Sequence, residues 1–159
     1  MNAAHLHLII NHLPIIGSVL GSFVLAYGLY TKSSETKSAA YYLLILSTLG
    51  AIIAYLTGEP AEETVENIQG ISKAMIHQHE DFAGFSLAVL CLTGVLSLMG
   101  LYVLFMKKIW SVKLAKLILF LSLISFVLFS ITGYYGGQIR HTELNSSSVS
   151  GNPEDADRD

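Results

Sequence analysis

Residues 117–139 read LILFLSLISFVLFSITGYYGGQI and contain no Lys, Arg, Asp or Glu. A helix that crosses the hydrocarbon core of a bilayer needs about 20 such residues. Three further uncharged runs of comparable length cover residues 1–31, 38–58 and 82–106. Because a chain in lipid must satisfy its backbone polar groups internally, each run predicts a helix. The sequence therefore predicts an all-α fold, an integral membrane four-helix bundle.

The rest of the chain leaves room for little besides this bundle. Charged residues make up 13% of the chain, against about 25% in soluble domains. We assign residues 1–142 to one four-helix transmembrane domain. Between the second and third runs, residues 59–72 carry Pro60 and several glutamates, which predicts a short interfacial helix across the bundle mouth. Residues 143–159 are polar and end in an acidic cluster, so we expect a disordered acidic tail.

The basic residues are unevenly shared between the two sides of this bundle. The links between the first and second runs and between the third and fourth runs hold Lys32, Lys37, Lys107, Lys108, Lys113 and Lys116. The opposite side holds only Lys73, Arg140 and Arg158. The positive-inside rule then places both links in the cytoplasm and both termini outside it.

All six histidines fall on the side opposite the lysine-rich links. They are His5, His7, His12, His77, His79 and His141. Histidine is a common ligand for metal ions and haem iron, and an ionisable side chain is costly near a bilayer. This gathering predicts a metal or haem site at the outer end of the bundle.

His12 is the deepest histidine by sequence, about two turns into its uncharged run. Pro14 beside it removes a backbone donor, frees the carbonyl near Ile10 and can kink the helix. We therefore expect His12 to be a ligand, with His79 or His141 opposite it from another helix. His7 should matter next. His5 and His77 should matter least, because solvated histidines at an interface are common.

Several of these residues also form a recognisable pattern. The opening has the form H-x-x-x-x-H-x-P, and later motifs pair small residues with a histidine. The residues are His7, His12, Pro14, Thr57-Gly58, Ala61, His79, Gly136-Gly137 and His141. Together they resemble a family of bacterial four-helix membrane proteins that is known as a domain of unknown function. The chain departs from the family pattern at Leu8, where a proline is usual, and at Arg140 and Thr142.

The resemblance implies a redox-associated bacterial membrane protein that holds b-type haem. With the lysine distribution, we expect it in the inner membrane with periplasmic termini. Noncovalent haem needs one or two histidines on facing helices, an apolar slot and partners for its propionates. The candidates to bind haem are His7, His12, His79 and His141, with Arg140 placed to pair with a propionate. Such a protein would pass electrons, for example from a quinol to a periplasmic carrier, so it is at most an electron-transfer or oxidoreductase subunit.

Two alternatives to haem fit the same residues. In the first, the four histidines together with Glu59 and Glu63 hold a non-haem Cu, Zn or Fe ion. In the second, the protein is a structural subunit of a homo-oligomer or larger membrane complex, and its histidines are merely interfacial. The sequence has no nucleophile with a base, no phosphate-binding loop and no basic patch for nucleic acid. We therefore expect no hydrolytic chemistry and no nucleic-acid partner.

Overall fold

The computed structural model describes residues 3–65 and 73–140, with side chains for residues 5–61 and 73–139. All regular structure in these ranges is helical: α1 (Ala3–Ile10), α2 (His12–Tyr30), α3 (Ser34–Leu56), α4 (Gly58–Val65), α5 (Lys73–Phe105) and α6 (Ser111–Arg140). Four helical stretches are long and apolar enough to cross a membrane, the first of them made of α1 and α2 together. The prediction of an all-α fold with four spanning helices is confirmed. The predicted acidic tail lies outside the described residues.

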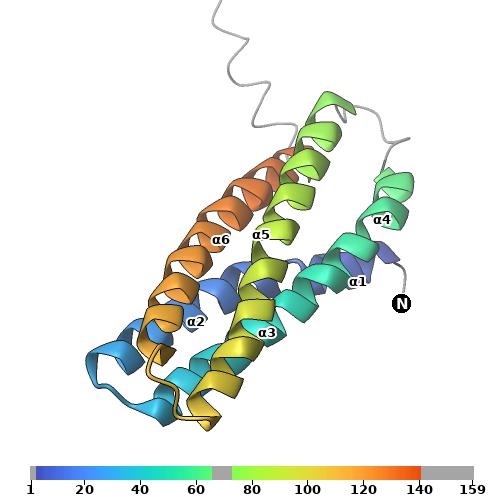
Figure 1. Cartoon of the computed structure of the whole chain (residues 1–159). Helices are drawn as coiled ribbons and strands as arrows, with labels where there is room; N and C mark the ends of the chain where they lie inside the picture. The colour runs from blue at the N-terminus through green and yellow to red at the C-terminus, as the bar shows by residue number, and fades with distance from the viewer. Residues whose placement is uncertain (1–2, 66–72, 141–159) are drawn as a thin grey trace, which may run out of the picture.

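The four long helices form one bundle (Figure 1). Helix α2 packs against α3 and α6, and α5 packs against the same two helices. Each long helix therefore has two neighbours, and the ring of contacts is closed. Leu25, Tyr41, Leu44, Val103 and Ile118 fill one half of the interior, and a smaller cluster around Leu90 and Phe129 fills the other.

Glycines allow the helices to approach closely. A Cβ added to Gly17 would lie 2.7 Å from Cβ of Ser47, and one added to Gly94 would lie 2.5 Å from Oγ1 of Thr48. Small residues at helix contacts are typical of membrane bundles, where lipid gives no hydrophobic force to drive helices together. The packing motifs therefore hold α2, α3 and α5 at short range.

Buried hydroxyl groups connect the helices further. Ser22 and Ser122 share a hydrogen bond of 2.7 Å between α2 and α6, and Ser86 and Thr132 share one of 3.0 Å between α5 and α6. Oγ1 of Thr48 donates to the carbonyl of Leu90 at 3.1 Å, joining α3 to α5. Such bonds add a modest stabilisation to each contact because their groups find no water in the interior.

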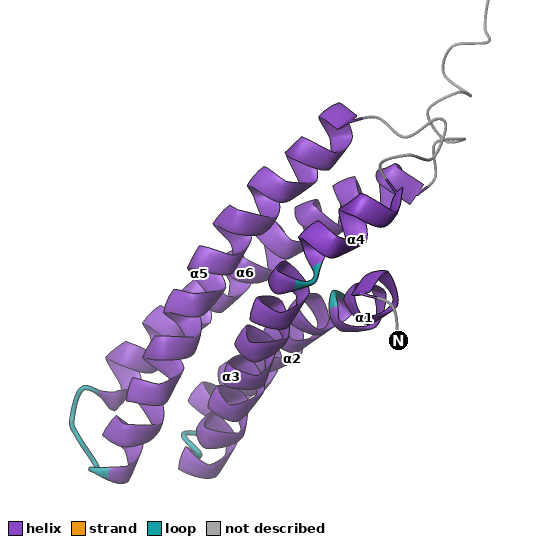
Figure 2. Cartoon of the chain, turned by 90° about the vertical axis from the view of Figure 1, so that its right-hand side faces the viewer, coloured by secondary structure: helices purple, strands orange, loops and turns teal. Residues whose placement is uncertain are grey.

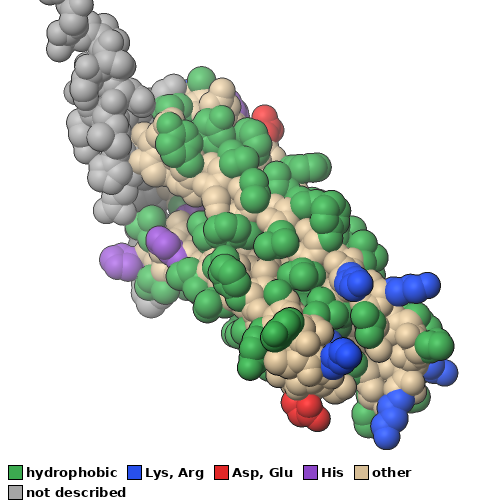
Figure 3. All heavy atoms as spheres, turned by 90° about the vertical axis from the view of Figure 1, so that its left-hand side faces the viewer, with side chains coloured by type: hydrophobic (Ala, Val, Ile, Leu, Met, Phe, Trp, Pro, Cys, Tyr) green, Lys and Arg blue, Asp and Glu red, His purple; other side chains and the backbone are tan. Residues whose placement is uncertain are grey.

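The two ends of the bundle differ in chemistry. Lysines gather at one end and histidines at the other (Figure 3). We call them the lysine end, with Lys32, Lys107, Lys108, Lys113 and Lys116, and the histidine end, with His5, His7, His12, His77 and His79. The lysines of the two links and the described histidines thus lie at opposite ends of the bundle, as the order of the uncharged runs predicted.

The first span is not one straight helix. It breaks at Asn11, between α1 and α2, and α1 turns aside from the axis of α2 (Figure 2). Pro14 has no N–H to donate to the carbonyl four residues back, at Ile10, so the helical ladder is open at this point. The predicted kink is therefore present, and it separates His7 on α1 from His12 on α2.

Helix α4 follows α3 after a single residue, Thr57. The N–H of Thr57 donates to Ile53 at 3.1 Å and the N–H of Ala61 donates to Thr57 at 3.3 Å, so the helical path is nearly continuous. The described part of α4 runs on from α3 and packs against α1 (Figures 1 and 2). This differs from the expectation that the segment lies across the bundle mouth. Residues 66–72 of that segment lie outside the described ranges.

Candidate functional site at the histidine end

His7 is a half-buried residue of α1 that reaches α3. Its Nδ1 lies 2.9 Å from the carbonyl oxygen of Ala54 and 3.4 Å from Oγ1 of Thr57. A carbonyl can only accept, so the Nδ1–H of His7 is the donor. Gly58 lies beside the ring, because a Cβ at this position would be 3.8 Å from Cε1 of His7.

His79 occupies the matching position between α5 and α6. Its Nδ1–H donates to the carbonyl of Thr132 at 2.9 Å, and Oγ1 of Thr132 is itself bonded to Ser86. A Cβ on Gly136 would lie only 3.0 Å from Cε1 of His79, so the glycine leaves the space that the imidazole fills. One turn further along α5, Phe82 stacks on Tyr135 with ring centroids 5.2 Å apart and fixes α5 against α6.

The two imidazoles share a chemical state. In both rings a main-chain carbonyl holds the proton on Nδ1, so the lone pair of Nε2 is left to bind something else. This is the arrangement usual for metal-ligating histidines, whose second nitrogen is oriented by a carbonyl or carboxylate. In this tautomer each ring keeps one nitrogen free to act as a ligand.

The other described histidines point elsewhere. His12 is exposed, and its Nδ1 lies 3.2 Å from the carbonyl of Leu8 on the preceding turn. His5 is exposed, and His77 is exposed with its Nδ1 3.4 Å from a carboxylate oxygen of Glu80. The structure thus gives His7 the inward position that the sequence suggested for His12. The break at Asn11 is the reason, since it turns the face of α1 independently of α2.

The remaining predicted site residues are Glu59, Glu63, Arg140 and His141. Glu59 is exposed at the start of α4. The side chains of Glu63 and Arg140, and the whole of His141, lie outside the description. Among the side chains that are described, no three His, Cys, Asp or Glu residues come together as a metal-binding group. Within these ranges the two histidines that reach a neighbouring helix are His7, which contacts α3, and His79, which contacts α6.

Some residues at the site escaped the sequence argument. Thr57 and Gly136 had been noted only as parts of motifs, and Ala54 and Thr132 act through their carbonyls, which every residue has. Asn11 is more informative: its Oδ1 is buried and has no hydrogen-bond partner. It lies at the break between α1 and α2, and no sequence motif marks it.

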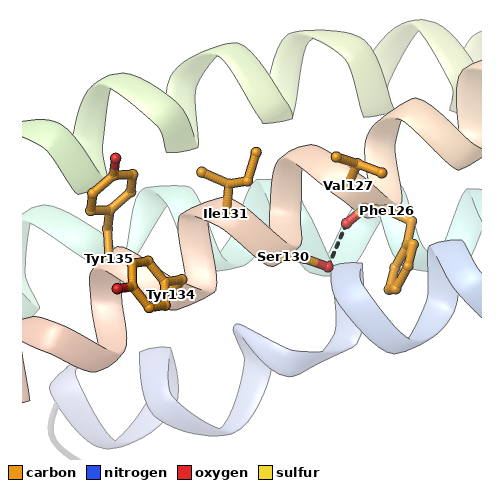
Figure 4. A pocket seen from close by; sticks show the side chains of 6 residues that line it. All are labelled: Phe126, Val127, Ser130, Ile131, Tyr134 and Tyr135. Atoms are coloured by element: carbon orange, nitrogen blue, oxygen red, sulfur yellow. Dashed lines mark hydrogen bonds between the residues drawn. The ribbon is translucent and has the colours of Figure 1, made fainter.

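A shallow groove lies on the outward face of α6 near this site (Figure 4). It has a volume of about 460 Å³ and is lined by Phe126, Val127, Ser130, Ile131, Tyr134 and Tyr135. Its only small polar side chain is Ser130, whose hydroxyl donates to the carbonyl of Phe126 at 2.7 Å. Tyr135 joins the groove to the bundle interior through its stacking on Phe82.

Comparison with known proteins gives no relative. No protein-family model matches the chain, and neither a curated protein nor a solved structure matches it.

Proposed function

We propose that this protein is a membrane-bound b-type haem protein for electron transfer, with His7 and His79 as the axial ligands. The observation that carries the proposal is the matched state of these two half-buried rings. They come from different helices at one end of the bundle, and each has its Nδ1–H bound to a main-chain carbonyl at 2.9 Å. Two free Nε2 atoms are the donor set that a six-coordinate haem requires.

Haem iron supplies a one-electron couple when it is bound. The residues of the chain would orient the ligands and tune that couple. The carbonyls of Ala54 and Thr132 hold the rings in one tautomer and raise the basicity of Nε2. Gly58 and Gly136 leave room for the rings of His7 and His79 themselves. Arg140 ends α6 at the same end of the bundle, where its guanidinium is suited to a propionate.

A non-haem Cu, Zn or Fe ion is the second candidate for the same pair of nitrogens. Two imidazoles rarely suffice for such an ion, which usually takes four or more ligands. Further ligands would have to come from Glu59, Glu63, His12 or His141. Haem needs only one or two histidine ligands, which His7 and His79 would provide, and we therefore favour it.

A quinol is the electron donor that fits the surroundings best. The groove on α6 opens toward the lipid side of the bundle, and its walls are mostly apolar and aromatic. Thr132, whose carbonyl holds His79, belongs to the same stretch of α6 as the groove residues Ile131 and Tyr134. A periplasmic carrier would accept the electron, and a larger membrane complex or homo-oligomer remains compatible with this role.

The same reading assigns the protein to the bacterial inner membrane as a multi-pass protein with periplasmic termini. The support is the gathering of lysines at one end of the bundle. A reporter that is active only in the cytoplasm, fused after Asp159, should be silent. Strong reporter activity would place the histidine end in the cytoplasm and contradict the assignment.

The test of the cofactor is an absorption spectrum of the purified protein together with metal analysis. The wild type should show a Soret band, and His7→Ala and His79→Ala should lose it. His5→Ala and His77→Ala are matched controls, because both rings are exposed and should keep bound haem. Haem that stays bound in His12→Ala would favour His7 as the ligand, as the structure suggests, over His12, which the sequence favoured. A wild type with neither Soret band nor stoichiometric metal would leave only a structural role.

A further inference from the structure

A second groove lies at the lysine end, between the start of α3 and the end of α5. It has a volume of about 500 Å³. Its lining residues are Ser34, Glu35, Ser38, Tyr42, Leu101, Tyr102, Leu104 and Phe105. Because α3 begins at Ser34 and α5 ends at Phe105, the groove sits where these two candidate spans terminate. It is therefore at the level of lipid headgroups rather than of acyl-chain ends.

The two walls of this groove differ in character. Helix α5 supplies the apolar side chains Leu101, Leu104 and Phe105, and the side chain of Phe105 is 81% exposed. Helix α3 supplies the hydroxyls of Ser34 and Ser38 and the carboxylate of Glu35. An exposed phenyl ring beside exposed polar groups matches a ligand that is itself apolar at one end and polar at the other.

Charges of both signs flank the groove. The carboxylate of Glu35 accepts a hydrogen bond of 3.1 Å from Ser33, and the described residues form no ion pair with it. Lys37 acts on it only at longer range and is itself buried, with 5% of its surface exposed. A carboxylate has about four lone-pair sites, so Glu35 can accept further hydrogen bonds. Glu35 is thus available to a cationic group of a ligand.

The positive charges belong to the chain that leaves the other helix of the groove, α5. Lys107 and Lys108 follow the groove residue Phe105 after one intervening residue, Met106, and are held in a tight turn. The N–H of Lys107 donates to Leu104 at 3.0 Å, and the N–H of Lys108 donates to Val103 at 3.1 Å. Lys107 has a positive φ of 50°, so the chain reverses direction just after α5, two and three residues beyond the groove residue Phe105.

We propose that this groove binds a phospholipid whose headgroup carries a primary amine. The ammonium binds Glu35, the phosphate faces Lys107 and Lys108, and the acyl chains lie along Leu101 and Leu104. A choline headgroup has no N–H to donate to the carboxylate. An anionic headgroup without an amine would be repelled by Glu35. The proposal concerns the end of the bundle opposite the histidine site, so it is independent of haem binding.

The experiment is native mass spectrometry of the full chain with lipids that have identical acyl chains and ethanolamine, choline or glycerol headgroups. The wild type should retain the ethanolamine lipid about two- to fivefold better than either of the others, the range expected for one interfacial ion pair. Glu35→Gln should abolish that preference. Glu80→Gln, which removes an exposed carboxylate at the histidine end, is the matched control and should keep it.

Two further results decide the proposal. Ser38→Phe fills the groove and should lower retention of all three lipids, with helical content by circular dichroism confirming that the bundle is intact. Equal retention of the three lipids by the wild type would mean nonspecific lipid contact. Preferred retention of the glycerol lipid would mean that the lysines alone recruit lipid. Either outcome, or an unchanged preference in Glu35→Gln, overturns the proposal.

Discussion

The lysine half and the histidine end of this bundle are held together in different ways. Toward the lysine end, a Cβ on Gly28 would lie 2.9 Å from the backbone nitrogen of Lys37, and one on Gly100 would lie 2.8 Å from the ring of Tyr41. At the histidine end, Gly58 and Gly84 have only distant neighbours at 3.8 and 4.0 Å, and Gly137 has none within 4 Å. In the lysine half glycine lets helix pack directly on helix, whereas at the histidine end the space left by Gly136 is filled by the imidazole of His79, 3.0 Å away.

This difference separates stability from chemistry. Where glycine brings two helices into direct contact, an added side chain has no space, because a close-packed interior shifts only at a cost in free energy. The histidine end instead depends on directed hydrogen bonds, from His7 to Ala54 and from His79 to Thr132. Substitutions in the two regions should therefore fail in different ways, one in folding and the other in cofactor retention.

The largest effect is expected for Gly28→Leu. The new side chain would meet the backbone of Thr36 and Lys37, at 3.2 and 2.9 Å from its Cβ, and these atoms cannot move without separating α2 from α3. We expect the free energy of unfolding to fall by about 3 kcal/mol, measured by thermal or detergent unfolding. Gly137→Leu is the control and should change it by less than about 0.5 kcal/mol. An equal fall in the free energy of unfolding in both variants would show that the two regions do not differ in packing.

A smaller and more specific effect is expected for Gly136→Val. Its Cβ would lie 3.0 Å from Cε1 and 3.2 Å from Nδ1 of His79, so the imidazole must leave the Thr132 carbonyl. Cofactor affinity should fall about tenfold, as when an orienting partner of a ligand is lost, while helical content is unchanged. The adjacent Gly137→Val should keep the cofactor. An intact Soret band in Gly136→Val would remove His79 from the site.

Pro14→Ala tests the broken first span. Alanine restores the N–H that can donate to Ile10, so α1 and α2 should join into a straighter helix and draw His7 away from Ala54. Spin labels at the exposed residues Ile9 and Leu56 should report a longer separation, and cofactor retention should fall less than in Gly136→Val. An unchanged label separation would show that Asn11, rather than the proline, sets the break.

The smallest effect is expected for Ser122→Ala. This variant removes the 2.7 Å hydrogen bond between Ser122 and Ser22 that joins α6 to α2. Interhelical hydrogen bonds of this kind contribute about 0.6 kcal/mol in membrane proteins, so unfolding should shift slightly. Ser130→Ala is the control, since Ser130 bonds only to Phe126 on its own helix. A loss in Ser130→Ala as large as in Ser122→Ala would argue against a role for the interhelical bond.

Much of the fold could be read from the sequence because lipid imposes a simple rule. Uncharged runs long enough to cross a bilayer must be helical, and the four predicted runs coincide with the four candidate spans. Because successive spans alternate in direction, the order of the uncharged runs also predicted the end of the bundle at which the described histidines and lysines lie. The kink beside Pro14 was also predictable, since a missing N–H opens the helical ladder whatever surrounds it.

The tertiary structure alone decided which histidines face inward. By sequence depth His12 ranked first, but its ring is exposed, while His7 and His79 are held by carbonyls of Ala54 and Thr132. A carbonyl acceptor has no sequence signature, and the rotation of α1 about Asn11 depends on its packing against α3 and α4. The sequence by itself determined that this chain is a four-helix bundle with its histidines at one end. Only the packing of helices, which fixes rotation about each axis, decided that His7 and His79 reach neighbouring helices while His12 is exposed.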